Sequence, residues 1–327
     1  MKTRRSFIRT LGASTALAGM GISSLNAAVS QVLPGASGEG KPVRIGIIGA
    51  ENSHTIKFGK LFNIDKKFPG MEVKYVWGET EEFARNAAQK GHIPNIVKDP
   101  LEMMGKIDAL IVDHRHPKYH LQAAEPFVKA GIPAFIDKPF CYRLDEGKKF
   151  LAMARSVGTP VTSYSSAAHI EGTFDMKKQV EEMGEISHVI FSGPVDLESP
   201  YGGIFFYGVH LVQPLMYIFG DDIRKVRITS SGKNATGSMV WENGMLATMI
   251  FKNLSWGFGR FVETKDGAVE LKPRVEESDP ARNYTDMVEM FRTGKEPRSH
   301  ESILKSVAVL EALEKSALNE KWIDVKI

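Results

Sequence analysis

Short apolar runs alternate with stretches of helical periodicity in the first half of the chain. The runs cover residues 43–48, 72–77, 109–112 and 132–136, and the expected helices follow Gly49 and cover 81–90 and 120–130. Strands that alternate with helices form parallel sheets with right-handed crossovers, and helices cover both faces of such sheets. The sequence therefore predicts a parallel α/β domain over residues 42–160.

After Pro160 the expected strands become longer, and their apolar and polar residues alternate more strictly. They cover residues 187–192, 226–230, 238–241, 246–252 and 258–263, with helices near 173–183, 207–219, 281–293 and 300–318. Alternating strands are typical of an antiparallel sheet that has one open face. We therefore expect residues 161–327 to form an α+β domain with an open, mainly antiparallel sheet.

The first 41 residues have the composition of an export signal followed by a linker. Arg4 and Arg5 precede a weakly apolar stretch, residues 11–25, that is rich in Ala, Gly, Ser and Thr. Residues 34–42 are mostly turn-formers. This layout is typical of a twin-arginine signal peptide, a route that exports proteins already folded. The sequence thus predicts a periplasmic or otherwise exported protein.

Composition excludes several classes of site and partner. Cys141 is the only cysteine, which excludes an intramolecular disulfide and a cysteine-ligated zinc or iron–sulfur site. The formal charge is +3, but the first 28 residues hold four basic and no acidic side chains, so the rest is nearly neutral. We therefore expect a small-molecule substrate, no nucleic acid and no membrane span.

The turn after the first strand departs from the dinucleotide-binding motif G-x-G-x-x-G. Gly49 keeps the first position, but Glu51 replaces the second glycine and His54 the third. The second glycine normally lets the backbone approach the pyrophosphate, and a carboxylate ~4 Å from a phosphate costs about 4 kcal/mol at an effective dielectric near 20. Either Asn52 or Ser53 caps the helix and Glu51 favours its positive end, or Glu51 and His54 line a site.

Residues 113–120 form an unusual polar cluster, Asp-His-Arg-His-Pro-Lys-Tyr-His. His116 and His120 lie one helical turn apart and could bind a metal together with Asp113 or His114. Alternatively, His120 packs inside the domain. We expect no resident metal.

Several motifs together resemble the Gfo/Idh/MocA family, named for glucose–fructose oxidoreductase and inositol dehydrogenase. They are the glycine turn at Gly49, the segment Asp137-Lys138-Pro139 after a late strand, the segment Gly208-Val209-His210, and a turn of the type F-x-x-G-x-x-P at residues 291–297. The resemblance covers roughly residues 42–327. It implies a Rossmann domain joined to an open-sheet domain, and an enzyme that oxidises or reduces CH–OH groups with NAD or NADP.

The resemblance also assigns site residues. Lys138 matches the family's catalytic lysine, and His210 matches its acid/base or hydroxyl-binding histidine. The acids that flank this histidine in the family are replaced here by Phe206 and Gln213. The expected cofactor-binding residues are Gly49, Glu51, Asn52, Ser53, His54, Glu79, His116 and Lys138, and the expected substrate contacts are Tyr164, His169, Tyr201 and Gln213.

Three functions are compatible with these sequence features. The first is an exported NAD(P)-dependent oxidoreductase that acts on a sugar, a cyclitol or a derivative. The second is a non-redox lyase, hydrolase or epimerase on the same scaffold, in which Glu51, His116, Lys138 and His210 are acid/base groups or metal ligands. The third is a non-catalytic carbohydrate-binding protein. The resemblance further implies a homo-oligomer formed through the open sheet, and a last helix that packs back on the first domain.

Overall fold

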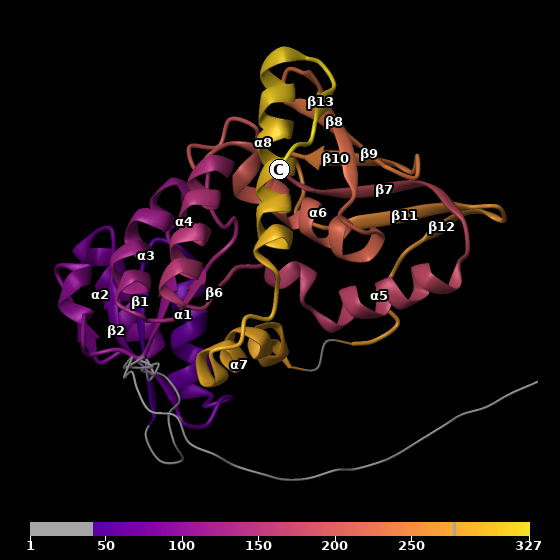
Figure 1. Cartoon of the computed structure of the whole chain (residues 1–327). Helices are drawn as coiled ribbons and strands as arrows, with labels where there is room; N and C mark the ends of the chain where they lie inside the picture. The colour runs from indigo at the N-terminus through magenta and orange to yellow at the C-terminus, as the bar shows by residue number, and fades with distance from the viewer. Residues whose placement is uncertain (1–41, 277–278) are drawn as a thin grey trace, which may run out of the picture. The chain divides into compact units, whose positions relative to one another are not determined.

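The computed structural model describes residues 42–276 and 279–327 (Figure 1). Its first sheet is parallel and has the strand order β3-β2-β1-β4-β5-β6, which is the order of a Rossmann fold. The strands are β1 (Val43–Ile48), β2 (Met71–Trp77), β3 (Asn95–Ile96), β4 (Ala109–Val112), β5 (Ala134–Ile136) and β6 (Val161–Thr162). All residues of β4 and β5 are buried, because helices cover both faces. The predicted α/β class is confirmed.

Four main helices connect these strands. They are α1 (Ser53–Gly59), α2 (Glu81–Gly91), α3 (His120–Lys129) and α4 (Leu144–Val157). The helix expected after Gly49 continues beyond α1 as a π-helical segment, Lys60–Ile64. Helices α1 and α2 cross at two glycines, where a Cβ on Gly59 would lie 2.5 Å from the Cα of Gly91. Helix α4 has no counterpart among the helices expected from the sequence.

The second sheet is mixed and has the strand order β12-β11-β7-β10-β9-β8-β13. Its strands are β7 (Ile186–Pro194), β8 (Ile223–Ser231), β9 (Asn234–Trp241), β10 (Leu246–Lys252), β11 (Gly259–Thr264), β12 (Gly267–Glu270) and β13 (Ile323–Asp324). Every pair is antiparallel except β7 with β10. The expectation of a mainly antiparallel sheet is confirmed, although β12 and β13 were not expected.

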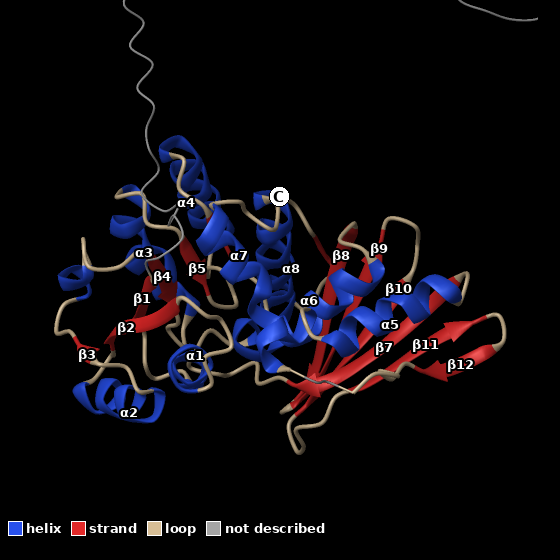
Figure 2. Ribbon diagram, turned by 90° about the horizontal axis from the view of Figure 1, so that it is seen from below, coloured by secondary structure: helices blue, strands red, loops and turns tan. Residues whose placement is uncertain are grey.

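Helices cover one face of this sheet. They are α5 (Glu171–Glu182), α6 (Ile204–Phe219) and α8 (His300–Asn319), and Figure 2 shows α5 and α6 on the same side of the strands. Val189, Phe191 and Met249 are buried under them, whereas the intervening Ile190 and Ile250 are 36% and 42% exposed. The sheet therefore has a packed face and an open face.

The C-terminal elements also contact the first domain. Helix α7 (Thr285–Thr293) places Met287 and Phe291 in the same apolar cluster as Phe58 and Phe135. Glu314 of α8 accepts a hydrogen bond of 2.7 Å from Arg143, just before α4. Side chains from both sheets can meet because the described residues, 42–276 and 279–327, belong to one compact unit. The domain limits themselves stay a prediction.

Two expectations concern the chain's location. The expected signal peptide and linker, residues 1–41, lie outside the described residues. Among the helices of residues 42–276 and 279–327, none is long and apolar enough to cross a bilayer.

Candidate functional site

A cavity of about 150 Å³ lies where the loops after β1, β4 and β5 meet α6. The carboxyl ends of parallel strands share one edge of a sheet, and ligands of α/β proteins bind at that edge. The lining residues are Glu51, Asn52, Ser53, His54, Arg115, Lys138, Phe206, Tyr207 and His210. A larger hollow of about 370 Å³, around Phe62 and Pro69, lies at the amino ends of β1 and β2, away from these groups. The cavity thus brings together Lys138, His210 and the turn after β1, as the sequence predicted.

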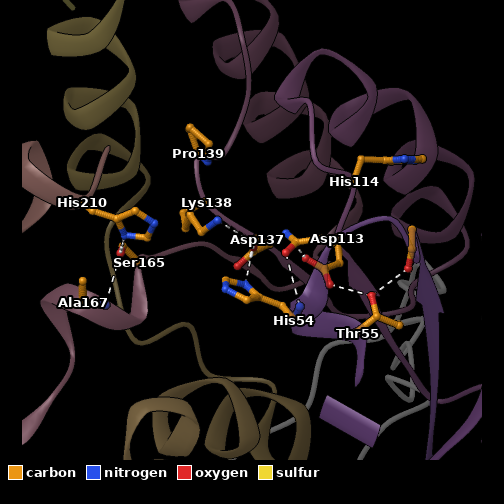
Figure 3. A network of polar contacts seen from close by, with 12 residues as sticks. His54, Thr55, Asp113, His114, Asp137, Lys138, Pro139, Ser165, Ala167 and His210 are labelled. Carbon is orange, nitrogen blue, oxygen red and sulfur yellow. Dashed lines mark hydrogen bonds and ion pairs between the residues drawn. The ribbon is translucent and has the colours of Figure 1, made fainter. Parts of the chain in front are cut away.

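Lys138 and Asp137 follow β5 and are both buried. The Lys138 Nζ lies 3.5 Å from Asp137 Oδ2. Burial by itself raises the pKa of Asp137, but the Lys138 ammonium and His54 outweigh it and hold that pKa below its ordinary value. Asp137 is therefore an ionised carboxylate beneath the cavity (Figure 3).

His54 contacts the same carboxylate. Its Nδ1 lies 3.1 Å from Asp137 Oδ2, and the side chain is 14% exposed. Asn52 caps α1, since its Oδ1 accepts a hydrogen bond from the His54 backbone N–H at 3.3 Å. The two interpretations of this turn are therefore compatible, because Asn52 caps the helix while His54 lines the cavity.

Asp113, after β4, lies beside Asp137 in the neighbouring loop. Asn52 Nδ2 donates to it at 2.8 Å, and Thr55 Oγ1 lies 2.7 Å from its Oδ2. Burial, together with the negative charge of Asp137, raises the pKa of Asp113 well above its ordinary value. The pKa values of the two neighbouring carboxyl groups are thus moved in opposite directions, upward for Asp113 and downward for Asp137.

His54, Asp113 and Asp137 offer ligand atoms within 4.8 Å of one another, yet they do not fit a cation. Asn52 already donates to both carboxyl groups, and the Lys138 ammonium lies against Asp137. The alternative site at His116 and His120 fits no better. Both ring nitrogens of His120 lie within 2.9 Å of backbone carbonyls, and burial lowers its pKa to about 4. His120 is thus a packing residue.

His210 reaches the cavity from α6. Its Nδ1 lies 3.0 Å from Ser165 Oγ, and Gln213 Oε1 accepts a hydrogen bond of 2.6 Å from the Ser165 backbone N–H. Burial, then the charge of Lys138, lowers the pKa of His210 well below its ordinary value, so the imidazole is neutral. Gln213 does not line the cavity. It fixes the backbone of the residue that contacts His210.

Glu51 is paired across the two domains. The Tyr201 hydroxyl donates a hydrogen bond to its carboxylate, and the Arg115 guanidinium lies 4.0 Å away. Arg115 also stacks over the ring of Tyr201, at 4.4 Å from the centroid. The charge of Glu51 at the second glycine position is therefore partly offset by Arg115 and by the Tyr201 hydroxyl.

Glu79 reaches the turn after β1 despite its offset by one residue. Its Oε2 accepts hydrogen bonds of 2.9 Å from the backbone N–H groups of Ala50 and Glu51, and its Oε1 lies 2.9 Å from His114 Nδ1. Burial works to raise its pKa, but these donors outweigh it and lower the pKa to about 2. Gly49 has φ +111°, and a Cβ there would lie 2.6 Å from the Asp113 backbone, so the tight turn requires glycine.

The remaining predicted contacts lie away from the cavity lining. Tyr164 is 1% exposed, and its hydroxyl accepts a hydrogen bond of 3.2 Å from the Met287 backbone. His169 stacks on Tyr164 at 4.1 Å between ring centroids, and burial lowers its pKa to about 3. His116 lies in a neighbouring hollow beside Tyr142, and burial lowers its pKa to about 4.

The sequence analysis named Asp113 and Asp137 but did not foresee that they lie together, and it did not foresee the contact of Ser165 with His210. Asp113 and Asp137 end neighbouring strands, β4 and β5, so the rule that carboxyl ends share one edge was a usable signal for their contact. Ser165 carried no such signal, because its bond to His210 depends on how α6 packs.

Residues 43–165 match the model of the Gfo/Idh/MocA family, described as an oxidoreductase family with an NAD-binding Rossmann fold. The search of curated protein sequences returns no match.

Solved structures with the same fold span nearly the whole chain. Myo-inositol 2-dehydrogenase from Lactobacillus plantarum is 17% identical, with TM-score 0.73 over 88% of this chain and 100% of that one. Myo-inositol dehydrogenase from Lactobacillus casei, in complex with NAD(H) and myo-inositol, is 13% identical, with TM-score 0.71 over 88% and 97%. GenD2 from gentamicin A biosynthesis, in complex with NAD, is 13% identical, with TM-score 0.74 over 89% and 99%. At these identities the likeness shows the fold.

Proposed function

Because residues 43–165 belong to the Gfo/Idh/MocA family of NAD-binding oxidoreductases, we propose that the chain is an NAD(P)-dependent oxidoreductase acting on a sugar, a cyclitol or a derivative. One observation carries the proposal. Lys138, at the end of β5, and His210, on α6, line the same cavity beside the dinucleotide turn. The inositol dehydrogenases that share this fold support the substrate class.

The residues of the first sheet fit a dinucleotide. Gly49 keeps the tight turn, and the backbone of residues 49–53 leads into the N-terminus of α1. Glu79 accepts hydrogen bonds from the backbone N–H groups of Ala50 and Glu51 in this turn. The carboxylate of Glu51 accepts a hydrogen bond from the Tyr201 hydroxyl. When bound, the nicotinamide supplies a hydride acceptor or donor.

The chain's own groups bind and orient the reacting oxygen. The Lys138 ammonium is a donor that Asp137 holds in place at 3.5 Å, and the neutral His210 ring lines the same cavity. The volume of this cavity, about 150 Å³, is small for a ligand site. The substrate is therefore a small polyol or single sugar rather than an oligosaccharide.

The proposal includes export and self-association. The adjacent Arg4 and Arg5, which precede the apolar residues 11–25, support twin-arginine export to the periplasm. Replacing both with lysine and fractionating the cells tests this, because a variant that still reaches the periplasm in full amount contradicts it. The open face of the second sheet supports a homo-oligomer.

A panel of sugars, cyclitols and sugar acids tests the activity by two readouts, nicotinamide absorbance and product mass. The oxidoreductase predicts a product that differs from its substrate by two hydrogens and forms only with NAD(P). The His54–Asp137 pair and Glu51 favour a non-redox lyase or epimerase as the second candidate. A product formed from nicotinamide-free protein supports that candidate and rejects the first.

A further inference from the structure

We propose that His54, which stands where the dinucleotide motif has its third glycine, is the general base of this site. This inference rests on the proposed function and names the group that takes the proton from the substrate hydroxyl. Which histidine can accept a proton is decided by which of its ring nitrogens is already protonated.

His54 has the arrangement of a base that a carboxylate orients. Its Nδ1 lies 3.1 Å from Asp137 Oδ2, and Asp137 is ionised and can only accept. The proton of neutral His54 therefore sits on Nδ1, and Nε2 keeps its lone pair. The ring lines the cavity, and Figure 3 shows it beside the carboxylate of Asp137, which Lys138 also approaches.

His210 has the opposite tautomer. The Ser165 hydroxyl accepts a hydrogen bond of 3.2 Å from the Ala167 backbone N–H, and its only other contact among the described residues is His210 Nδ1 at 3.0 Å. The hydroxyl proton therefore points at Nδ1, which leaves His210 protonated at Nε2. A neutral imidazole in this state donates a hydrogen bond to a substrate oxygen and cannot take its proton.

The division of roles follows from these two states. His210 Nε2–H and the Lys138 ammonium hold the substrate oxygen, and His54 Nε2 accepts its proton, so that one O–H bond breaks and one N–H bond forms. The imidazolium that results lies against the Asp137 carboxylate. In the direction of reduction, the same proton returns to the oxygen.

Long-range ¹H–¹⁵N NMR on the ligand-free protein tests the inference without any substrate. We expect His54 to be protonated at Nδ1 and bare at Nε2, and His210 to be protonated at Nε2. Asp137→Asn, whose amide can donate to Nδ1, should move the His54 proton to Nε2. If His54 carries its proton on Nε2 in the unaltered protein, the inference is overturned.

Kinetics on the substrate found in the panel give a second test. His54→Gln should lower kcat roughly 100- to 10,000-fold, the usual effect of removing a positioned base. Added imidazole should restore part of the activity of His54→Ala. His92→Asn, an exposed position in the left-handed C-cap of α2, is the control and should keep full activity.

The two proposals fail separately. If turnover needs NAD(P) and His54→Gln keeps near-normal kcat, the inference is wrong and the oxidoreductase stands. If His54→Gln abolishes a turnover that needs no nicotinamide, the oxidoreductase is wrong and the base stands. A circular dichroism spectrum and a thermal unfolding midpoint like those of the unaltered protein show that His54→Gln remains folded.

Discussion

Lys138, just after β5, and His210, on α6, reach one cavity from two different parts of the fold, and Lys138 lies beside the buried Asp137. Their residue types and their motifs were visible in the sequence. The bond between Asp137 and His54 was not, because a periodic pattern places His54 in the first turn of a helix without showing what it contacts.

The first prediction concerns these two groups. Either Lys138→Ala or His210→Ala should lower turnover by roughly 100- to 10,000-fold, because each removes a group positioned on the reacting oxygen. Residues that act as a unit are not additive, so the double variant should be little worse than the poorer single variant. Steady-state kcat on the panel substrate is the measurement. Near-normal turnover in both single variants contradicts the placement of the site.

The carboxylate of Glu51 shows how a residue's contacts change the meaning of its charge. Considered alone, its charge should repel a pyrophosphate, but the structure places the Tyr201 hydroxyl and Arg115 around the carboxylate. Tyr201 was expected to contact substrate, and its contact with Glu51 depends on how the two domains pack, which no local pattern encodes.

Tyr201→Phe should therefore weaken NAD(P) binding. A hydrogen bond to a charged group contributes about 1.5–3 kcal/mol, and its loss leaves the carboxylate free to turn toward the phosphates. We expect roughly a tenfold weaker calorimetric affinity, more at low salt because salt screens the repulsion. The double variant Tyr201→Phe with Glu51→Gln should bind like the unaltered protein. An unchanged affinity in Tyr201→Phe shows that Glu51 does not face the cofactor.

At the level of elements, the alternation of apolar runs predicted β1, β2, β4 and β5 and the change of sheet type after Pro160. The very short strands β3 and β13 were missed, because two residues carry no period and pair only where β2 and β8 already stand. Glu79 shows the same limit. Its position, one residue later than the family pattern, counted against a role at this turn. In the structure, the backbone N–H groups of Ala50 and Glu51 donate to its carboxylate.

The carboxylate of Glu79 makes this turn sensitive to acid. Its folded pKa of about 2 is below the unfolded value of 4.5, so the unfolded chain binds more protons between these values. The stabilisation is complete above about pH 4.5 and is lost as the pH falls toward 2. A shift of this size corresponds to about 3 kcal/mol.

Glu79→Gln should therefore flatten the rise of unfolding free energy between about pH 2 and pH 4.5. Urea unfolding followed by circular dichroism measures it at each pH. The control is Glu82→Gln, an exposed residue in the first turn of α2. If Glu79→Gln and the control show the same pH dependence, Glu79 does not bind the turn in solution.

At the scale of the whole molecule, the open face of the second sheet is the largest structural feature without a partner in the described ranges. On it, Ile190 is 36% exposed and Ile250 and Phe261 are each 42% exposed. Contiguous exposed apolar side chains of this kind mark association surfaces in folded proteins. The sequence predicted the open face from alternating strands, and the oligomer stays a prediction.

Replacing Ile250 and Phe261 with lysine should shift the protein from an oligomer to a monomer in light scattering after size exclusion, because buried lysines at an interface are strongly unfavourable. Replacing the exposed Leu318 with lysine, a residue of α8 and not of the open face, is the matched control. A monomer in the unaltered protein at micromolar concentration contradicts self-association.

The central claim is that the cavity with Lys138 and His210 belongs to a nicotinamide-dependent enzyme. Native mass spectrometry of the freshly purified full chain, with and without added NAD(P), tests it most directly. We expect one dinucleotide bound per chain, either retained from the cell or bound on addition, and weaker dinucleotide binding in Tyr201→Phe. A folded protein that takes up neither NAD nor NADP at millimolar concentration contradicts it.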